Sequence, residues 1–202
     1  MVERYQRQGP LAHLGLAARA AAAPADAGVV LSERGFVSQL ALRGRGDPAF
    51  VEAVESALGI APPLEPNRVH ERGRVRVLWL GPDEWLVVAP DGKGEGLAKK
   101  LLEKLKGQAA AAVEVTEARA VIGLTGPKAR DVLSHGCSLD LHPRAFGPGQ
   151  CAQTLLARLP VILHQRDAAP SYDVYVARSM AEYLWGWLED AGAGYGVAVV
   201  EA

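Results

Sequence analysis

The chain has 202 residues, of which 49% are hydrophobic and 22% charged, and its 22 basic residues nearly balance its 23 acidic ones. This balance argues against non-specific nucleic-acid binding, which needs a field of basic residues to displace counterions from phosphates. Two cysteines exclude a disulfide framework, so we expect a globular protein with its own core and reduced thiols, located in the cytoplasm.

Residues 1–25 are rich in alanine and carry arginines before a short apolar stretch. His13 and Arg19 interrupt that stretch, which is too short for the core of a signal peptide. No run approaches the roughly 20 apolar residues that a membrane helix needs. We expect residues 1–25 to form an N-terminal arm that crosses the surface of the protein or of a partner, and a disordered tail is the alternative.

The apolar pattern from residue 28 to 108 changes between period 2 and period 3.6, which predicts strand, strand, helix, strand, strand, helix. The first helix has the sharpest signals, because Asp47 is a good N-cap, Pro48 suits the first helical position and Gly59 ends the pattern. The predicted elements are, in order, 29–31, 36–42, 48–58, 75–79, 85–89 and 97–105.

A similar order of elements recurs between residues 109 and 202. Leu42 lines up with Leu124 at an offset of 82 residues, and Ala89 lines up with Ala177 at an offset of 88. The two anchors agree within a short insertion, so we infer an internally duplicated β-β-α-β-β-α unit. The predicted elements of this half are, in order, 113–116, 120–124, 126–133, 154–163, 172–177, 180–190 and a closing strand at 195–200.

The duplication predicts the fold class. Each half has open sheet edges and an incomplete core, so the two halves should pack together. We expect a single pseudo-symmetric α+β domain over residues 26–202, with antiparallel sheets and helices. Its repeat halves should cover about 28–108 and 109–202.

The glycine-rich segment 92–96 follows a predicted strand and opens a helix, where a phosphate-binding loop would lie. Its spacing fails for both common motifs. A dinucleotide fingerprint needs glycine at the position of Leu97, and a Walker loop needs Gly-Lys-Ser or Gly-Lys-Thr at its end. A flexible turn at the helix start is the favoured interpretation.

The segment 135–154 holds both cysteines and two of the five histidines. Thiolate and imidazole are the ligands that zinc prefers, but structural zinc sites use closely spaced pairs, which this segment lacks. A nucleophilic cysteine with a histidine base is a second possibility, and buried, inert cysteines are favoured over both. The residues that raise these possibilities are His135, Cys137, His142 and Cys151.

Asp140 and His142 alternate with Leu139 and Leu141, so an extended backbone would place both polar side chains on one face. They could then act as an acid-base pair. The favoured alternative is structural: Asp140 accepts backbone N–H groups, and His142, held extended before Pro143, orders the turn.

The C-terminal helix carries an aromatic residue that its apolar face does not account for. Trp185 lies between Glu182 and Glu189, on what should be the outer side of the helix, whereas core packing accounts for Tyr183 and Trp187. An exposed indole is a typical anchor of a protein interface, and lateral packing is the alternative.

Several motifs together resemble one family. They are a Gly-Pro-Asp turn within residues 80–86, the segment 136–154 with its Cys-Ser-Leu-Asp-Leu-His-Pro core, and the aromatic helix segment 183–188. Residues 9–13, Gly-Pro-Leu-Ala-His, also resemble the amino-terminal signature of that family. On these residues the chain, from about residue 9 to its end, resembles the gamma subunit of heterotetrameric sarcosine oxidase.

The resemblance implies a fold similar to the folate-binding domain of aminomethyltransferase and a role as a non-catalytic structural subunit. The family's complex oxidises sarcosine to glycine, passes the one-carbon unit to tetrahydrofolate as 5,10-methylenetetrahydrofolate and forms hydrogen peroxide. FAD, FMN, NAD and tetrahydrofolate are expected in the partner subunits, and no cofactor in this chain. Direct contact with the alpha subunit is implied, with beta and delta subunits in the same complex.

Three hypotheses therefore stand: a structural subunit of such an oxidoreductase complex, a stand-alone folate-binding or one-carbon-transfer protein, and a metal or thiol enzyme built on residues 135–151. Under the first, no catalytic, cofactor-binding or metal-ligating residue is expected. The residues expected at the partner interface are Leu11, His13, Leu139, Asp140, His142, Arg144, Phe146 and Trp185.

Overall fold

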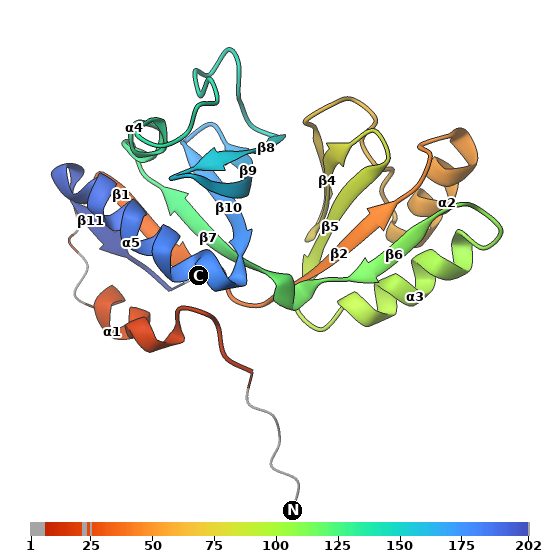
Figure 1. Ribbon diagram of the computed structural model, residues 1–202, viewed down its shortest axis with the longest axis horizontal. Coiled ribbons are helices and arrows are strands. Elements are labelled where there is room, and N and C mark those ends of the chain that lie inside the picture. Colours follow the sequence, from red (N-terminus) through yellow and green to blue (C-terminus); the bar gives the residue numbers. More distant parts are fainter. Residues whose placement is uncertain (1–6, 22–23, 25, 202) are drawn as a thin grey trace, which may run out of the picture.

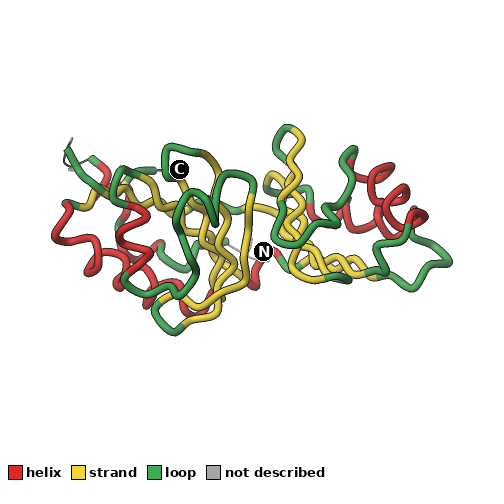
Figure 2. Tube along the Cα trace, turned by 90° about the horizontal axis from the view of Figure 1, so that it is seen from above, coloured by secondary structure: helices red, strands yellow, loops and turns green. Residues whose placement is uncertain are grey.

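The computed structural model describes residues 7–21, 24 and 26–201 and consists of two lobes, each a β-sheet with helices packed on its outer face (Figure 1). Figure 2 shows helices at the two outer ends of the molecule and most strands between them. This arrangement confirms the predicted α+β class. None of the helices in the described part is long and apolar enough to cross a membrane.

One lobe is built on six strands and is called the six-stranded lobe. Its strand order is β11-β1-β7-β10-β9-β8, antiparallel except for the β1–β11 pair. Two longer helices belong to this lobe, α4 (Ala129–Ser134) and α5 (Ala181–Gly192). The strands are β1 (Val29–Glu33), β7 (Arg119–Thr125), β8 (Gln150–Leu156), β9 (Leu159–Asp167), β10 (Ser171–Ala177) and β11 (Val197–Val199).

The other lobe, the five-stranded lobe, is an antiparallel sheet of order β3-β4-β5-β2-β6. Its outer face is covered by α2 (Pro48–Leu58) and α3 (Gly94–Lys104), which lie side by side in Figure 1. The strands are β2 (Val37–Arg43), β3 (Val69–Arg72), β4 (Val75–Gly81), β5 (Glu84–Pro90) and β6 (Ala111–Glu114).

Each sheet contains one strand that comes from the other half of the chain. β1 lies between β7 and β11 in the six-stranded lobe, while β6 pairs with β2 at the edge of the five-stranded lobe. With this exchange, the order β3-β4-β5-β2-β6 matches β8-β9-β10-β7-β1 strand for strand. The internal duplication is therefore confirmed. The exchange was not predicted, and because of it a division at residues 108 and 109 does not separate the two sheets.

The first long helix forms for the reasons that its sequence indicates. Asp47 has extended backbone angles, and its Oδ1 accepts the N–H of Phe50 at 2.9 Å. Pro48 fills the first helical position, where its missing N–H costs nothing. Gly59 ends the helix in the left-handed conformation at φ 77°. The predicted bounds of this helix are confirmed.

The single strand predicted over residues 154–163 is wrong. The chain forms a tight hairpin there, with β8 ending at Leu156 and β9 starting at Leu159. Ala157 and Arg158 make the turn with φ values of 51° and 69°. Two-residue hairpin turns need such positive φ angles, and asparagine and glycine are their usual signals. Because the turn consists of Ala157 and Arg158, with neither asparagine nor glycine, the sequence carries no signal for it.

Three clusters of buried side chains hold the lobes together. The largest lies between the six-stranded sheet and α4 and α5, and a second lies between the five-stranded sheet and α2 and α3. The third joins the two sheets and consists of Leu78, Leu86, Val88, Val121, Cys151, Ile162 and Tyr175. This third cluster marks the seam, the surface along which the two lobes meet.

Candidate functional site

The segment 135–154 leaves α4, loops around one end of the six-stranded lobe and returns as β8 (Figure 1). Its loop is anchored by apolar side chains, because Leu141 and Phe146 are both buried in the core of this lobe. Cys137 bridges to Leu156 through its backbone. The segment is therefore a folded part of the lobe, with an exposed turn between its two buried anchors.

The exposed turn is organised by its own polar side chains. Asp140 Oδ1 accepts the backbone N–H of His142 at 2.9 Å, and His142 Nδ1 accepts the backbone N–H of Arg144 at 3.2 Å. These contacts confirm the structural interpretation of Asp140 and His142. Both side chains are used to fix the backbone, and Nε of Arg144 also lies 3.4 Å from Nδ1 of His142, while the side chain of Arg144 and the face of the turn remain exposed.

The two cysteines lie in different surroundings. Cys151 is fully buried in the seam, its thiol donates to the carbonyl of Trp79 at 3.3 Å, and burial raises its pKa to about 12. Cys137 is partly buried, and its Sγ lies 3.7 Å from Thr154 Oγ1. Within the described ranges, no three His, Cys, Asp or Glu side chains are grouped so as to hold a metal ion.

The predicted exposure of Trp185 is wrong. Its indole is 1% exposed and lies in the core of the six-stranded lobe together with Leu11 and Phe146. The reason is the N-terminal segment. His13 Nε2 lies 3.3 Å from Glu182, and Arg19 pairs with Glu189, so the segment crosses α5 one turn to either side of the indole.

Burial divides the eight residues predicted to contact a partner. Leu11, Phe146 and Trp185 are brought together in the core of this chain, so their side chains offer no surface in this conformation. His13, Asp140, His142 and Arg144 are exposed and Leu139 is half-buried. The exposed ones do not form one patch, because Figure 1 places α1 (Leu16–Ala20) and the turn after α4 at opposite ends of the lobe. Tyr183, predicted as core, is instead 55% exposed.

The described part of the predicted N-terminal arm lies on the surface of this chain. It forms a short 3₁₀ turn, η1 (Ala12–Leu14), and then α1, and it inserts Leu11 into the core with 0% exposure. Arg7 contacts Asp91 Oδ1 at 2.6 Å and also pairs with Glu117, so this segment ties the six-stranded lobe to loops of the five-stranded one. The rest of the arm lies outside the described residues.

A charged cluster at the seam was missed by the sequence reasoning. Asp173 on β10 is 2% exposed, and it pairs with Arg34 at 3.0 Å and Arg166 at 2.9 Å. Burial alone would raise the pKa of Asp173, but the two guanidinium groups outweigh it and hold that pKa below its usual value. The available signal was an aspartate flanked by Tyr172 and Val174 in an otherwise apolar strand.

Two further groups at the seam are polar and buried. His164 on β9 is 1% exposed, its Nδ1 has no hydrogen-bond partner among the described residues, and burial lowers its pKa to about 4. Tyr175 on β10 is equally buried, and burial raises its pKa. The seam is therefore a mixed surface, with an apolar cluster beside a set of charged and neutral polar side chains.

The duplicated sheets with exchanged strands define a class of α+β proteins with an aminomethyltransferase-like fold. The crystal structure of glycine cleavage system aminomethyltransferase T from Bartonella henselae matches with a TM-score of 0.65, covering 95% of this chain and 51% of that one at 18% identity. At that identity the likeness shows the fold alone. It supports the expected resemblance in fold.

Within that class the chain belongs to the sarcosine oxidase gamma subunit family, whose model matches residues 43–194. It is 38% identical to sarcosine oxidase subunit gamma of an Arthrobacter species over 92% of this chain and 89% of that protein. A chain of heterotetrameric sarcosine oxidase from Corynebacterium sp. U-96 matches with a TM-score of 0.84 at 34% identity, over 94% of this chain and 96% of that one. The family resemblance inferred from the motifs is confirmed.

Proposed function

We propose that this chain is a non-catalytic structural subunit of a heterotetrameric sarcosine oxidase. One observation carries the proposal: the chain matches, almost end to end in both directions, one whole chain of a solved heterotetrameric sarcosine oxidase. A likeness of this extent covers both lobes and the exchanged strands. It therefore supports a common role for the whole chain and not only a shared core.

The non-catalytic part of the proposal rests on what the reactive side chains already do. Asp140 and His142 hold a turn through backbone N–H groups, and Asp173 is held by two arginines. The Cys151 thiol, with its raised pKa, is a poor source of thiolate, which is the nucleophilic form. Each group thus has a structural task that competes with acid, base or nucleophile chemistry.

The chemistry then belongs to the partners. We propose that the alpha subunit contacts this chain directly, that beta and delta subunits complete the complex, and that FAD, FMN, NAD and tetrahydrofolate are bound by those subunits. The complex would oxidise sarcosine to glycine in the cytoplasm, with hydrogen peroxide and 5,10-methylenetetrahydrofolate as the other products. A stand-alone folate-binding function rests on likeness to aminomethyltransferases alone, at 18% identity to the solved structure and at 27% identity over 118 residues to the protein from Saccharopolyspora erythraea, and we do not propose it.

The proposed partner contact uses the exposed turn of segment 135–154. Leu139, Asp140, His142 and Arg144 keep accessible surface there, whereas Leu11, Phe146 and Trp185 support the turn and the arm from the core. His13 marks a second, separate contact region beside the start of α5. We further propose that residues 26–202 form one domain, because the exchange of β1 and β6 ties the two lobes together.

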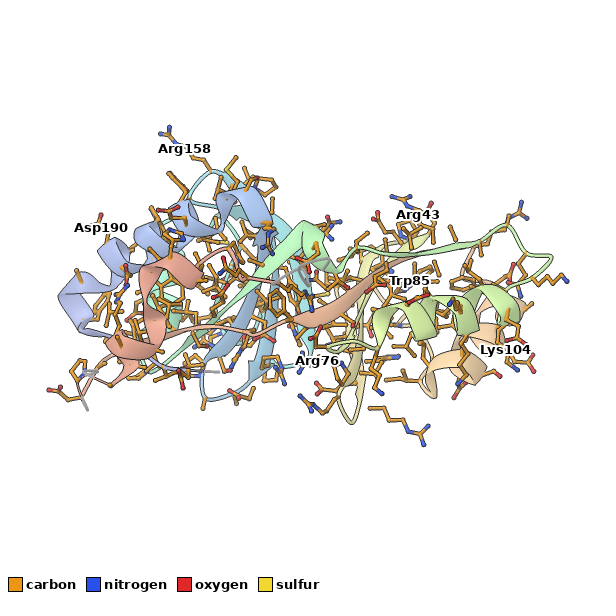
Figure 3. The ribbon with its side chains drawn as sticks, turned by 90° about the horizontal axis from the view of Figure 1, so that it is seen from below. Arg43, Arg76, Trp85, Lys104, Arg158 and Asp190 are labelled. Atoms are coloured by element: carbon orange, nitrogen blue, oxygen red, sulfur yellow. The ribbon has the colours of Figure 1, made fainter. Side chains whose placement is uncertain are left out.

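Co-expression with the candidate partner subunits followed by gel filtration tests the assembly. The wild-type chain should elute with the flavin-coloured complex, and a chain that elutes alone would refute the proposal. Arg144→Glu should weaken co-elution while leaving the melting temperature of the isolated chain unchanged, since its side chain is exposed. Lys104→Glu, on α3 at the far end of the other lobe (Figure 3), is the matched control and should leave co-elution intact.

A further inference from the structure

A pocket of about 300 Å³ opens at the seam, beside the Asp173 cluster. Elements of both lobes line it. Arg76 lies on β4 and Arg74 in the turn before β4, in the five-stranded lobe. Arg166 lies on β9 of the six-stranded lobe, and Arg34 lies in the connection between β1 and β2. The volume is at the lower end of the range of small-molecule sites. Figure 3 shows Arg76 at the junction of the two lobes, well away from Arg158.

The charges around this pocket do not cancel. The four arginines face two carboxylates, Asp173 and Glu71. Asp173 is shared by Arg34, Arg166 and Arg76, the last at 3.6 Å, while Glu71 lies 3.4 Å from Arg76 and 3.8 Å from Arg166. Arg74 is exposed and makes no ion pair with any described residue. The pocket therefore carries a surplus of about two positive charges, and guanidinium forks suit the oxygens of carboxylates and phosphates.

One buried polar group beside the pocket lacks an acceptor. The hydroxyl of Tyr175, a residue 1% exposed that lines the pocket, has no hydrogen-bond partner within the described part of the chain. Nε of Arg76 makes no well-aligned hydrogen bond there either, but it lies 3.4 Å from Oε1 of Glu71, which is its ion-pair partner. Leaving the O–H donor of Tyr175 unsatisfied costs about 1–3 kcal/mol, so this hydroxyl indicates a missing acceptor.

The remaining walls are apolar. Phe36, Val88 and Val121 line the pocket next to the arginines, and Val88 and Val121 are almost fully buried. A free inorganic ion would leave these walls in contact with water. An organic anion would use both surfaces, with its oxygens on the arginines and the Tyr175 hydroxyl and its carbon skeleton on the apolar side chains.

We propose that the seam pocket binds a small organic anion that carries two negative charges, a dicarboxylate or a phosphate monoester with a compact apolar body. This binding function goes beyond the assembly role and does not depend on it. Arg74 and the Tyr175 hydroxyl contact the ligand oxygens, while Arg34 and Arg166 remain the partners of Asp173. Because residues of both lobes form the pocket, a bound anion also stabilises their junction.

Calorimetry and thermal unfolding of the full-length chain test the site, with phthalate as the dicarboxylate, phenyl phosphate as the monoester and uncharged phthalamide as the matched control. At least one of the two anions should bind and raise the melting temperature, and phthalamide should not. Which of the two anions binds identifies the ligand class. Absence of binding by both anions at millimolar concentration would overturn the proposal.

Three variants locate the binding. Arg74→Gln and Tyr175→Phe should each weaken binding about tenfold, the usual size of one lost charge-assisted hydrogen bond. Tyr175→Phe should change the ligand-free melting temperature little, because the buried hydroxyl has no acceptor for its O–H and only the Arg76 guanidinium beside it. Arg158→Gln, an exposed arginine at the β8–β9 turn, should bind as the wild type does. Full affinity in both pocket variants, or an equal loss in Arg158→Gln, would refute the site.

Discussion

The Nε of Arg34 donates to Oδ1 of Asp173 at 3.0 Å, and the guanidinium reaches that carboxylate by crossing Gly123 of β7. Gly123 pairs in register with both Ser32 and Asp173. A side chain at this position would occupy the space that the guanidinium uses. Because Gly123 has no side chain, the Arg34 guanidinium can cross β7 and pair with the buried Asp173.

Gly123→Ala should lower the free energy of unfolding by about 2–4 kcal/mol, combining overpacking with loss of a buried ion pair. The added Cβ would lie 2.5 Å from Ser32 Oγ and 2.8 Å from Arg34 Cζ. Urea denaturation measures the change. Gly96→Ala on α3, whose Cβ would meet nothing within 4 Å, is the control and should be stabilising by up to about 1 kcal/mol. Equal changes in stability for the two substitutions would show that the Arg34 guanidinium does not pass over Gly123.

His164 makes stability depend on pH. Its folded-state pKa is about 4, against an ordinary value of 6.5, so below pH 6.5 the unfolded chain takes up a proton that the folded chain does not. The free energy of unfolding therefore has its full value, as far as His164 is concerned, above pH 6.5. It falls by about 2–3 kcal/mol as the pH drops from 6.5 toward 4. Urea titrations between pH 7 and pH 4 measure the loss. His164→Gln should flatten the profile in this window, and an unchanged profile would show that other groups cause it.

Local signals accounted for much of the fold. The cap at Asp47 and the stop at Gly59 are set by neighbours in sequence, so they could be read directly. The duplication was visible because equivalent strands keep similar apolar patterns. Which strand joins which sheet is set by pairing between residues about 90 positions apart, as for Leu31 and Leu124, and no local pattern encodes it. The strand exchange could therefore not be predicted from the sequence.

The site was predictable only in part, for the same reason. Glu182 and Glu189 placed Trp185 on a polar face of α5, and that placement along the helix was sound. What the sequence did not reveal is that His13 and Arg19 pair with those carboxylates and bring the N-terminal segment over the indole. A tertiary contact turned an apparently exposed anchor into a core residue.

The two thiols should differ in reactivity. Cys151 is buried, with a pKa of about 12, whereas Cys137 keeps partial exposure. Ellman's reagent at pH 8 should therefore modify Cys137 first, and Cys151 only after denaturation. Peptide mass spectrometry identifies the modified residue, and Cys137→Ser should abolish the fast phase. Rapid modification of Cys151 in the folded chain would show that the seam opens, against the packing described above.

Leu11 should behave as a core residue although it lies in the N-terminal segment. It is 0% exposed, so Leu11→Ala should destabilise the isolated chain by about 3 kcal/mol, as for other buried leucines. Leu102→Ala on α3 is the matched control, because that side chain is 49% exposed and should change stability by less than about 0.5 kcal/mol. If both variants unfold at the wild-type urea concentration, the segment does not pack on the lobe in solution.

Gly136, in the family signature, is required by the aromatic residue opposite it. A Cβ at this position would lie 2.5 Å from Cζ2 of Trp187 and 3.1 Å from the backbone nitrogen of Ala157, whose N–H donates to the Gly136 carbonyl. Gly136→Ala should therefore cost about 1–3 kcal/mol through overpacking. Trp187→Leu in the same chain should recover part of that loss, because the smaller side chain vacates the contested space. Gly186→Ala, on α5 with nothing within 4 Å, is the control and should be neutral or stabilising in the same urea titration. A double variant no more stable than the additive sum of its single variants would show that Trp187 is not the cause.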